Sequence, residues 1–230
     1  MPEIIPAVLP KNYEDMKNKV ALVRGFAPIV QIDICDGVFV KNTTWPFAGG
    51  KLDYHFEKIQ REEEGMPFWE DIDFELDLMV SDAVENFDIY TKLGPKRMVF
   101  HLKAVGDVEV FNEFLEGIDP YIKETISMGV AVSLDTPIED AFRVANNADF
   151  IQVMGIARPG FQGESFDERA LSYVSSLKEK FPDLIVSVDG GVNFDCAPEI
   201  LDAGADRLVA GSAIFNTDDI IGTIEEFKNL

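Results

Sequence analysis

The sequence predicts a single-domain (β/α)8 barrel, the TIM-barrel class of α/β fold, over residues 1–230. The chain is long enough for one large core, eight short runs rich in Val, Ile, Leu and Phe recur along it, and helix-length segments separate most of these runs. Alternating strands and helices predict a parallel sheet, and eight such units close most simply into a barrel, with an open doubly wound sheet as the alternative. The expected strands are 4–9, 29–34, 74–80, 97–102, 130–134, 150–156, 184–191 and 207–214.

The segments between these strands carry apolar residues at helical spacing. In chain order they are 12–26, 82–94, 108–129, 137–147, 167–181 and 195–205. The connection 37–72 is long for a strand-to-helix unit. Its aromatic residues are expected either to pack as core and loop residues or to form a lid or dimer contact over the active-site face; they are Trp45, Phe47, Phe68 and Trp69.

The charge of the chain limits its partners. With 42 acidic and 20 basic residues, its formal net charge is −22, which repels nucleic acid and anionic membranes at long range. No run approaches the ~18 apolar residues of a membrane span, and the N-terminus shows no signal-peptide pattern. The two cysteines, Cys35 and Cys196, form no disulfide or zinc-finger pattern. We therefore expect a cytoplasmic protein that binds neither nucleic acid nor membrane, and that makes any phosphate site locally from backbone N–H groups and helix N-termini.

Polar residues stand at the ends of several expected strands, where barrel enzymes place their chemistry. A carboxylate that points into an apolar barrel mouth is costly unless it is paired, hydrogen-bonded or bound to a metal. Several such residues together favour a functional site over a structural salt-bridge network built around a lysine. They are Gln31 and Asp33, Glu75 and Asp77, His101 and Lys103, and Asp189.

Glycine-rich segments follow the last three expected strands. They are ARPGFQGESF (157–166), DGGV (189–192) and AGSAIF (210–215). Glycine lets the main chain approach an anion closely, and the loops after the seventh and eighth strands of a barrel often hold a phosphate. Each segment alone is common turn chemistry, but three at consecutive strand ends predict a phosphate-binding site in this acidic chain.

These residues together resemble the ribulose-phosphate 3-epimerase family of ribulose-phosphate-binding barrels, over nearly the whole chain. The motifs that carry the likeness are I-x-P-x-x-L near the N-terminus, DICDGVFVKN, LDLMV, FHLKA, RPGFQGESF, VDGGV and AGSAIF. The resemblance implies an epimerase of the pentose phosphate reactions, which interconverts ribulose 5-phosphate and xylulose 5-phosphate by moving one proton at C3. It also implies a homo-oligomer.

The resemblance assigns acid/base roles to Asp33 and Asp189, and places Met79 as an apolar wall near the reacting carbons. The chemistry independently requires such a pair, because inversion beside a carbonyl needs one base to remove the proton and an acid to return it on the other face. The phosphate and substrate contacts that the resemblance implies are Gly160, Phe161, Gln162, Gly163, Gly190, Gly191, Gly211 and Ser212.

The sequence departs from the family pattern at its metal site. Gln31 and Asp77 stand where the family has histidine ligands, and Ala7 replaces a serine. One reading is an all-oxygen site for Mg²⁺ or Mn²⁺ rather than Zn²⁺, made by Gln31, Asp33, Asp77 and Asp189.

Two other readings remain open. In a metal-free site, Lys103 would supply the positive charge, with His101 as a possible hydrogen-bond donor. Alternatively, the reaction has changed, and the protein is a related sugar-phosphate lyase or decarboxylase, or a catalytically silent barrel that binds a phosphorylated ligand.

Overall fold

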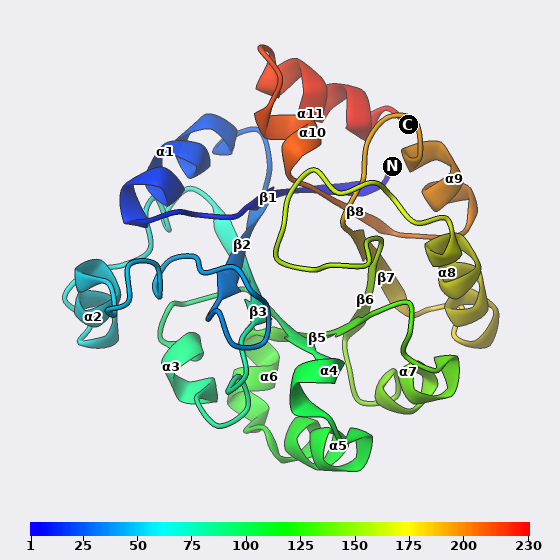
Figure 1. Ribbon diagram of the computed structural model, residues 1–230, viewed down its shortest axis with the longest axis horizontal. Coiled ribbons are helices and arrows are strands. Elements are labelled where there is room, and N and C mark those ends of the chain that lie inside the picture. Colours follow the sequence, from blue (N-terminus) through cyan, green and yellow to red (C-terminus); the bar gives the residue numbers. More distant parts are fainter.

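The computed structural model describes all residues from 1 to 230, and it shows eight parallel strands closed into a barrel in the order β1 to β8. Helices surround the barrel on its outside (Figure 1). The predicted TIM-barrel fold is therefore confirmed, and the open sheet is excluded. The strands are β1 Glu3–Val8, β2 Ile29–Cys35, β3 Asp73–Met79, β4 Arg97–His101, β5 Ser127–Val132, β6 Phe150–Met154, β7 Ile185–Asp189 and β8 Arg207–Ala210.

Five of the eleven helices begin at a side chain that accepts hydrogen bonds from the first turn. Asn12, Asp53 and Asp107 do this for α1, α2 and α5, satisfying N–H groups that have no partner within a helix. The helices are α1 Tyr13–Val23, α2 Tyr54–Gln60, α3 Phe87–Thr91, α4 Leu102–Val105, α5 Val108–Gly117, α6 Pro120–Thr125, α7 Ile138–Val144, α8 Arg169–Lys180, α9 Ala197–Asp202, α10 Ser212–Phe215 and α11 Ile220–Lys228. None of them is long and apolar enough to cross a bilayer.

The predicted helix 108–129 was wrong as one element, because this stretch contains α5, α6 and the start of β5. Asp119 accepts a hydrogen bond from the N–H of Tyr121, and Pro120 occupies the first position of α6. A side-chain cap followed by proline starts a new helix, so this pair interrupts the apolar pattern. The expected helix 82–94 is likewise shorter, and only Phe87–Thr91 is helical.

The long connection 37–72 contains α2, and its aromatic residues do not form a lid. Trp45 belongs to the hydrophobic core, and Phe47 and Phe68 pack against that core. Phe68 and Trp69 come just before β3 begins, so they lie near the opposite end of the barrel from the strand ends that carry the chemistry. Trp69 is exposed, and the core reading holds for the other three residues.

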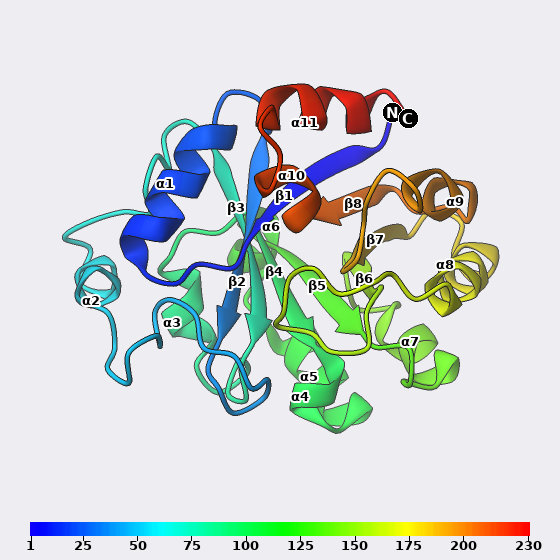
Figure 2. The ribbon, with the colours of Figure 1, turned by 45° about the horizontal axis from the view of Figure 1, so that its top comes forward.

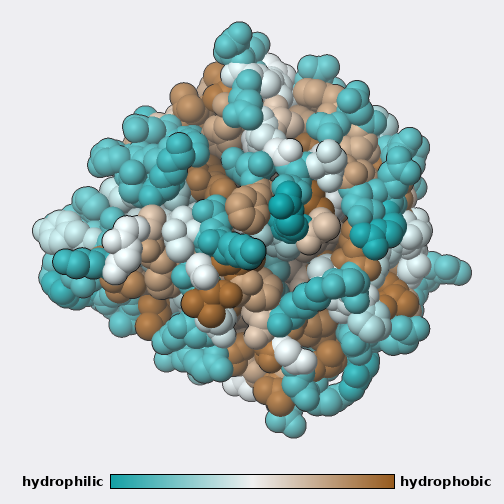
Figure 3. Space-filling model, viewed as in Figure 1, coloured by the Kyte–Doolittle hydropathy of each residue, from teal (hydrophilic) through white to brown (hydrophobic).

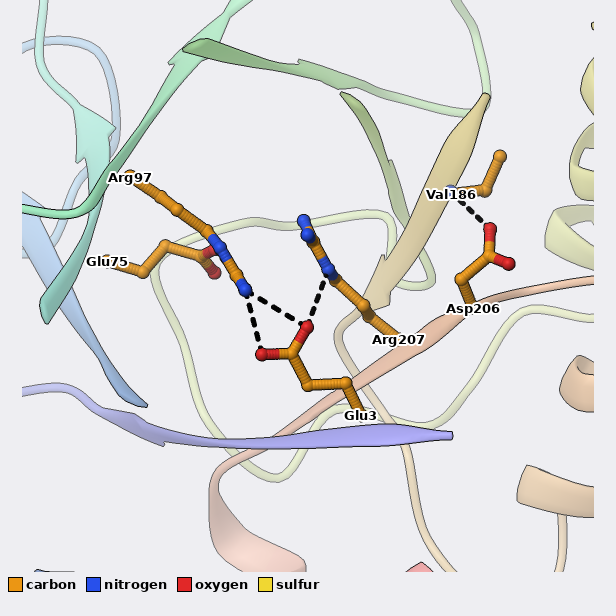
Figure 4. Close-up of polar contacts among 6 residues, drawn as sticks. All are labelled: Glu3, Glu75, Arg97, Val186, Asp206 and Arg207. Carbon is orange, nitrogen blue, oxygen red and sulfur yellow. Dashed lines mark hydrogen bonds and ion pairs between the residues drawn. The ribbon is translucent and has the colours of Figure 1, made fainter. Parts of the chain in front are cut away.

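Charged side chains close the end of the barrel where the strands begin (Figure 4). The carboxylate of Glu3 accepts hydrogen bonds from Arg97 Nη2 at 2.8 and 3.0 Å and from Arg207 Nε at 2.8 Å. Glu75 lies beside this group, fully buried, with Arg97 Nη1 3.5 Å away. Burial raises the pKa of Glu75 to about 7, although the two arginines oppose that rise. Both termini of the chain lie side by side at this end (Figure 2).

Candidate active site

Three carboxylates meet inside the barrel at the carboxyl ends of its strands. Asp33 lies near the end of β2, Asp77 lies beside it on β3, and Asp189 ends β7. One oxygen of each lies within 4.8 Å of the others. Side chains alternate between the two faces of a strand, so residues two positions apart point the same way. The polar residues at this spacing therefore point into the barrel together. The structure therefore brings together Asp33, Asp77 and Asp189, whereas Glu75, which the sequence analysis also singled out, lies beside Arg97 at the other end of the barrel.

Gln31 lies between the two expected acid/base residues. It is fully buried, and its Nε2 donates to Asp33 Oδ1 at 2.8 Å and to Asp189 Oδ2 at 2.9 Å. An amide N–H edge between two carboxylates reduces their mutual repulsion and holds both in fixed orientations. The glutamine therefore links the two aspartates at the position where the family pattern has an imidazole.

His101 and Lys103 differ in position. His101 is buried, and its Nε2 lies 2.7 Å from Asp77 Oδ1, so it fixes that carboxylate. Lys103 does not line the pocket; it lies on α4 as a half-exposed residue and pairs with Asp135. The inward alternation ends at His101, because α4 starts at the next residue. Lys103 therefore lies outside the carboxylate cluster, paired with Asp135.

Gln152 is a site residue that the sequence analysis missed. It is fully buried on β6, and its Nε2 lies 3.2 Å from Asp189 Oδ2 and 3.4 Å from Asp77 Oδ2. The available signal was one amide in the otherwise apolar strand FIQVM. A single polar residue forms no motif, and its partners come from distant parts of the chain.

Asp33 and Asp189 hold protons more tightly than free aspartates. Burial, followed by the nearby charges of Asp189 and Asp77, raises the pKa of Asp33 well above its usual range. Burial and the charge of Asp77 raise the pKa of Asp189 to about 8, against the lowering effect of its hydrogen bond from Gln31. These shifts favour a protonated carboxyl in the cluster at neutral pH.

The oxygen atoms around these carboxylates suit a hard divalent cation. The Oε1 atoms of Gln31 and Gln152 are buried without a hydrogen-bond partner, beside the three aspartates. A half-turn of either amide would direct its oxygen toward the carboxylates. The nearest imidazole, His101, is occupied by Asp77. A donor set of oxygens fits Mg²⁺ or Mn²⁺ better than Zn²⁺.

A pocket beside the carboxylates is lined by every residue that the resemblance assigned to the substrate and its phosphate. These residues are Met79, Gly160, Phe161, Gln162, Gly163, Gly190, Gly191, Gly211 and Ser212, together with Asp33 and Asp189. Gly190 and Gly191 have φ angles of +105° and +71°, which favour glycine. No lysine or arginine lines this pocket, so an anion there would rely on backbone N–H groups.

Two loops partly cover the pocket. The segments after β2 and between β6 and α8 reach over the barrel mouth in Figure 1. Asn42 Nδ2 donates to the carbonyl of Gly160 at 2.8 Å, joining these loops, and Gln162 Nε2 donates to the carbonyl of Ala7 at 3.1 Å. The remaining free space is about 40 Å³, enough for only a few waters. Hydrophilic side chains cover most of the rim of this face, and hydrophilic and apolar side chains lie side by side at its centre (Figure 3).

The fold and the site define a β/α barrel with a buried carboxylate cluster beside a glycine-lined pocket. Residues 3–215 match the Ribulose-phosphate 3 epimerase family, and the chain belongs to that family.

Curated relatives and solved structures agree with this membership. The chain is 28% identical over 230 residues to ribulose-phosphate 3-epimerase of Eremothecium gossypii, covering 99% of this chain and 92% of the relative. It is 26% identical to that of Bacillus subtilis, covering 99% of both chains. A structure of KGPDC from Streptococcus mutans aligns with a TM-score of 0.72 at 16% identity, covering 99% of this chain and 96% of that one, which shows the shared fold.

Proposed function

We propose that the protein is a ketopentose-phosphate 3-epimerase that interconverts ribulose 5-phosphate and xylulose 5-phosphate. The observation that carries this proposal is the placement of Asp33 and Asp189 on different strands, joined by Gln31, beside a glycine-lined pocket. Membership of the epimerase family supports the same reaction.

In the proposed mechanism, one aspartate removes the proton from C3 and the other returns a proton on the opposite face. The C3–H bond breaks, its electron pair forms the C2–C3 double bond, and the C2 carbonyl oxygen becomes anionic. Reprotonation at C3 from the second face reverses the electron flow and completes the inversion. The raised pKa values of Asp33 and Asp189 favour this exchange, because one residue carries a proton while the other accepts one.

Asp33, Asp77 and Asp189, with the carbonyl oxygen of Gln31, would hold a divalent cation. Such a cation, when bound, stabilises negative charge on the oxygens of the enediolate. The residues of the chain bind and orient the substrate: the pocket glycines leave room for the phosphate, and Met79 forms part of the pocket wall.

The test is exchange of the C3 proton of ribulose 5-phosphate in D₂O, followed by NMR after EDTA treatment and again with Mg²⁺, Mn²⁺ or Zn²⁺. We expect deuterium at C3 together with xylulose 5-phosphate, fastest with Mg²⁺ or Mn²⁺. Asp33→Asn and Asp189→Asn should each abolish epimerisation, whereas Asp140→Asn, on α7 and away from the pocket, serves as the matched control. Carbon–carbon cleavage products would instead favour the lyase reading, and the absence of any exchange would refute the epimerase.

A further inference from the structure

We propose that Gln152 is a positioning residue that holds Asp189, but not Asp33, in the orientation needed for proton transfer. This inference rests on the proposed epimerase function. It assigns a role to a residue of β6 that lies outside the pocket lining and outside the family's motifs in this sequence.

The contacts of Gln152 single out one of the two acid/base residues. Its Nε2 donates to Asp189 Oδ2 at 3.2 Å, and Gln31 donates to the same oxygen at 2.9 Å. The two amides come from β6 and β2, which lie on opposite walls of an eight-stranded barrel. Asp189 Oδ2 is thereby held from two sides, which fixes the rotation of the carboxylate and leaves Oδ1 available for the substrate.

Gln152 also separates two carboxylates. Its Nε2 lies 3.4 Å from Asp77 Oδ2, and Asp77 is held on its other oxygen by His101 at 2.7 Å. The three aspartates lie within 4.8 Å of one another, so repulsion would turn Asp189 away from Asp77 without an N–H donor between them. Gln152 thus places a donor where these two carboxylates approach each other.

The burial of Gln152 is unfavourable unless the amide has a role. It is fully buried, and its Oε1 has no hydrogen-bond partner. Branched apolar residues usually fill the interior of such barrels. An apolar residue at this position would leave no buried polar atom without a hydrogen-bond partner. The amide therefore needs a compensating interaction, and its hydrogen bonds to the aspartates supply one.

Asp33 receives no hydrogen bond from Gln152, and its side-chain donor is Gln31 alone. This asymmetry predicts an effect on one face of the substrate. Loss of Gln152 should impair the proton transfers of Asp189, whereas loss of Gln31 should impair those of both aspartates.

The experiment measures the exchange of the C3 proton for deuterium without epimerisation, starting separately from ribulose 5-phosphate and from xylulose 5-phosphate. This exchange needs only the aspartate that faces the C3 proton of that epimer, whereas epimerisation needs both. Asp189→Asn and Asp33→Asn identify which epimer each residue serves. All proteins are assayed under the metal condition that gives the fastest wild-type exchange.

Gln152→Met keeps the side-chain length and removes the amide. We expect exchange from the Asp189 epimer to fall about ten- to a hundredfold, as small misplacements of reacting groups do, and exchange from the Asp33 epimer to fall less than about threefold. Gln31→Leu, the matched comparison, should lower both. KM should stay close to wild type in Gln152→Met, since the phosphate pocket is unchanged.

Equal losses from both epimers, or no loss from either, would overturn the role of Gln152, because a purely structural residue would not discriminate between the faces. Gln152→Leu provides a second variant if Gln152→Met does not fold, as judged by near-UV circular dichroism. Failure of the proposed function is distinguishable, since wild-type protein would then show no exchange from either epimer, and the inference would fall with it.

Discussion

Asp189→Asn should stabilise the metal-free protein, and the gain should grow with pH. Burial and the charge of Asp77 raise the pKa of Asp189 to about 8 in the folded protein. The folded state therefore binds this proton more tightly than the unfolded chain, for which an aspartate pKa is near ~3.9. The protonated carboxyl stabilises the folded state fully at pH values below the pKa of the unfolded chain. This stabilisation is lost as pH rises through the pKa of the folded protein.

The size of the effect follows from the difference between the two pKa values. A gap of about four units corresponds to about 5 kcal/mol at about pH 8, since each unit is about 1.4 kcal/mol. Neighbouring carboxylates share the proton, so we expect about half of this, or about 2–3 kcal/mol at about pH 8 and less than about 1 kcal/mol at about pH 5. Asparagine also brings an NH₂ group, which can donate hydrogen bonds to the unpartnered Oε1 atoms of Gln31 and Gln152 after a half-turn of those amides.

The assay is urea unfolding in EDTA across about pH 5 to about pH 8, with Asp140→Asn as the control away from the cluster. The difference in the free energy of unfolding between Asp189→Asn and wild type should widen steadily with pH. A variant that is less stable than wild type at the upper pH, or a difference that does not change with pH, would refute this account of the carboxylate cluster.

Four other perturbations test separate parts of the structure. Glu3→Gln leaves Arg97 and Arg207 without their shared carboxylate and should cost about 2 kcal/mol in urea unfolding, below the range for a fully buried pair because Glu3 is partly exposed; an unchanged midpoint would contradict this. Gly211→Ala should raise KM about fivefold with little loss of stability, since its Cβ would meet chiefly a movable glutamine amide at 2.4 Å; unchanged KM would argue against a phosphate there. The kcat/KM for the dianionic substrate should rise as added salt screens the net charge of −22, and a fall would contradict repulsion as the dominant long-range effect. Burial raises the pKa of the Cys35 thiol, so a thiol reagent should leave it unlabelled in the native protein, as mass spectrometry would show.

The parts of the fold and site that depend on local pattern could be predicted from the sequence. Apolar runs identified all eight strands, and polar residues at strand ends identified Asp33, Asp77 and Asp189, because strand alternation and parallel packing bring such positions together. Glycine segments after the last strands likewise marked the pocket.

Features that depend on where an element stops, or on contacts across the barrel, were harder to predict. Lys103 shares a strand face with His101 in the sequence, but the strand ends at His101 and the following helix turns the lysine outward. Gln152 meets Asp77 and Asp189 only through barrel closure, and nothing in its neighbours along the chain indicates those contacts.

The glutamines also explain how a site can keep its carboxylates after losing imidazole ligands. An amide is neutral at every accessible pH and has a donor edge and an acceptor edge. In the structure the donor edges of Gln31 and Gln152 face aspartates, which limits repulsion, while their carbonyl oxygens have no partner. Turning an amide would offer the oxygen to a hard cation instead. The amides thus leave Asp33 and Asp189 supported and would favour a hard cation, which supports the proposed epimerase with a modified site.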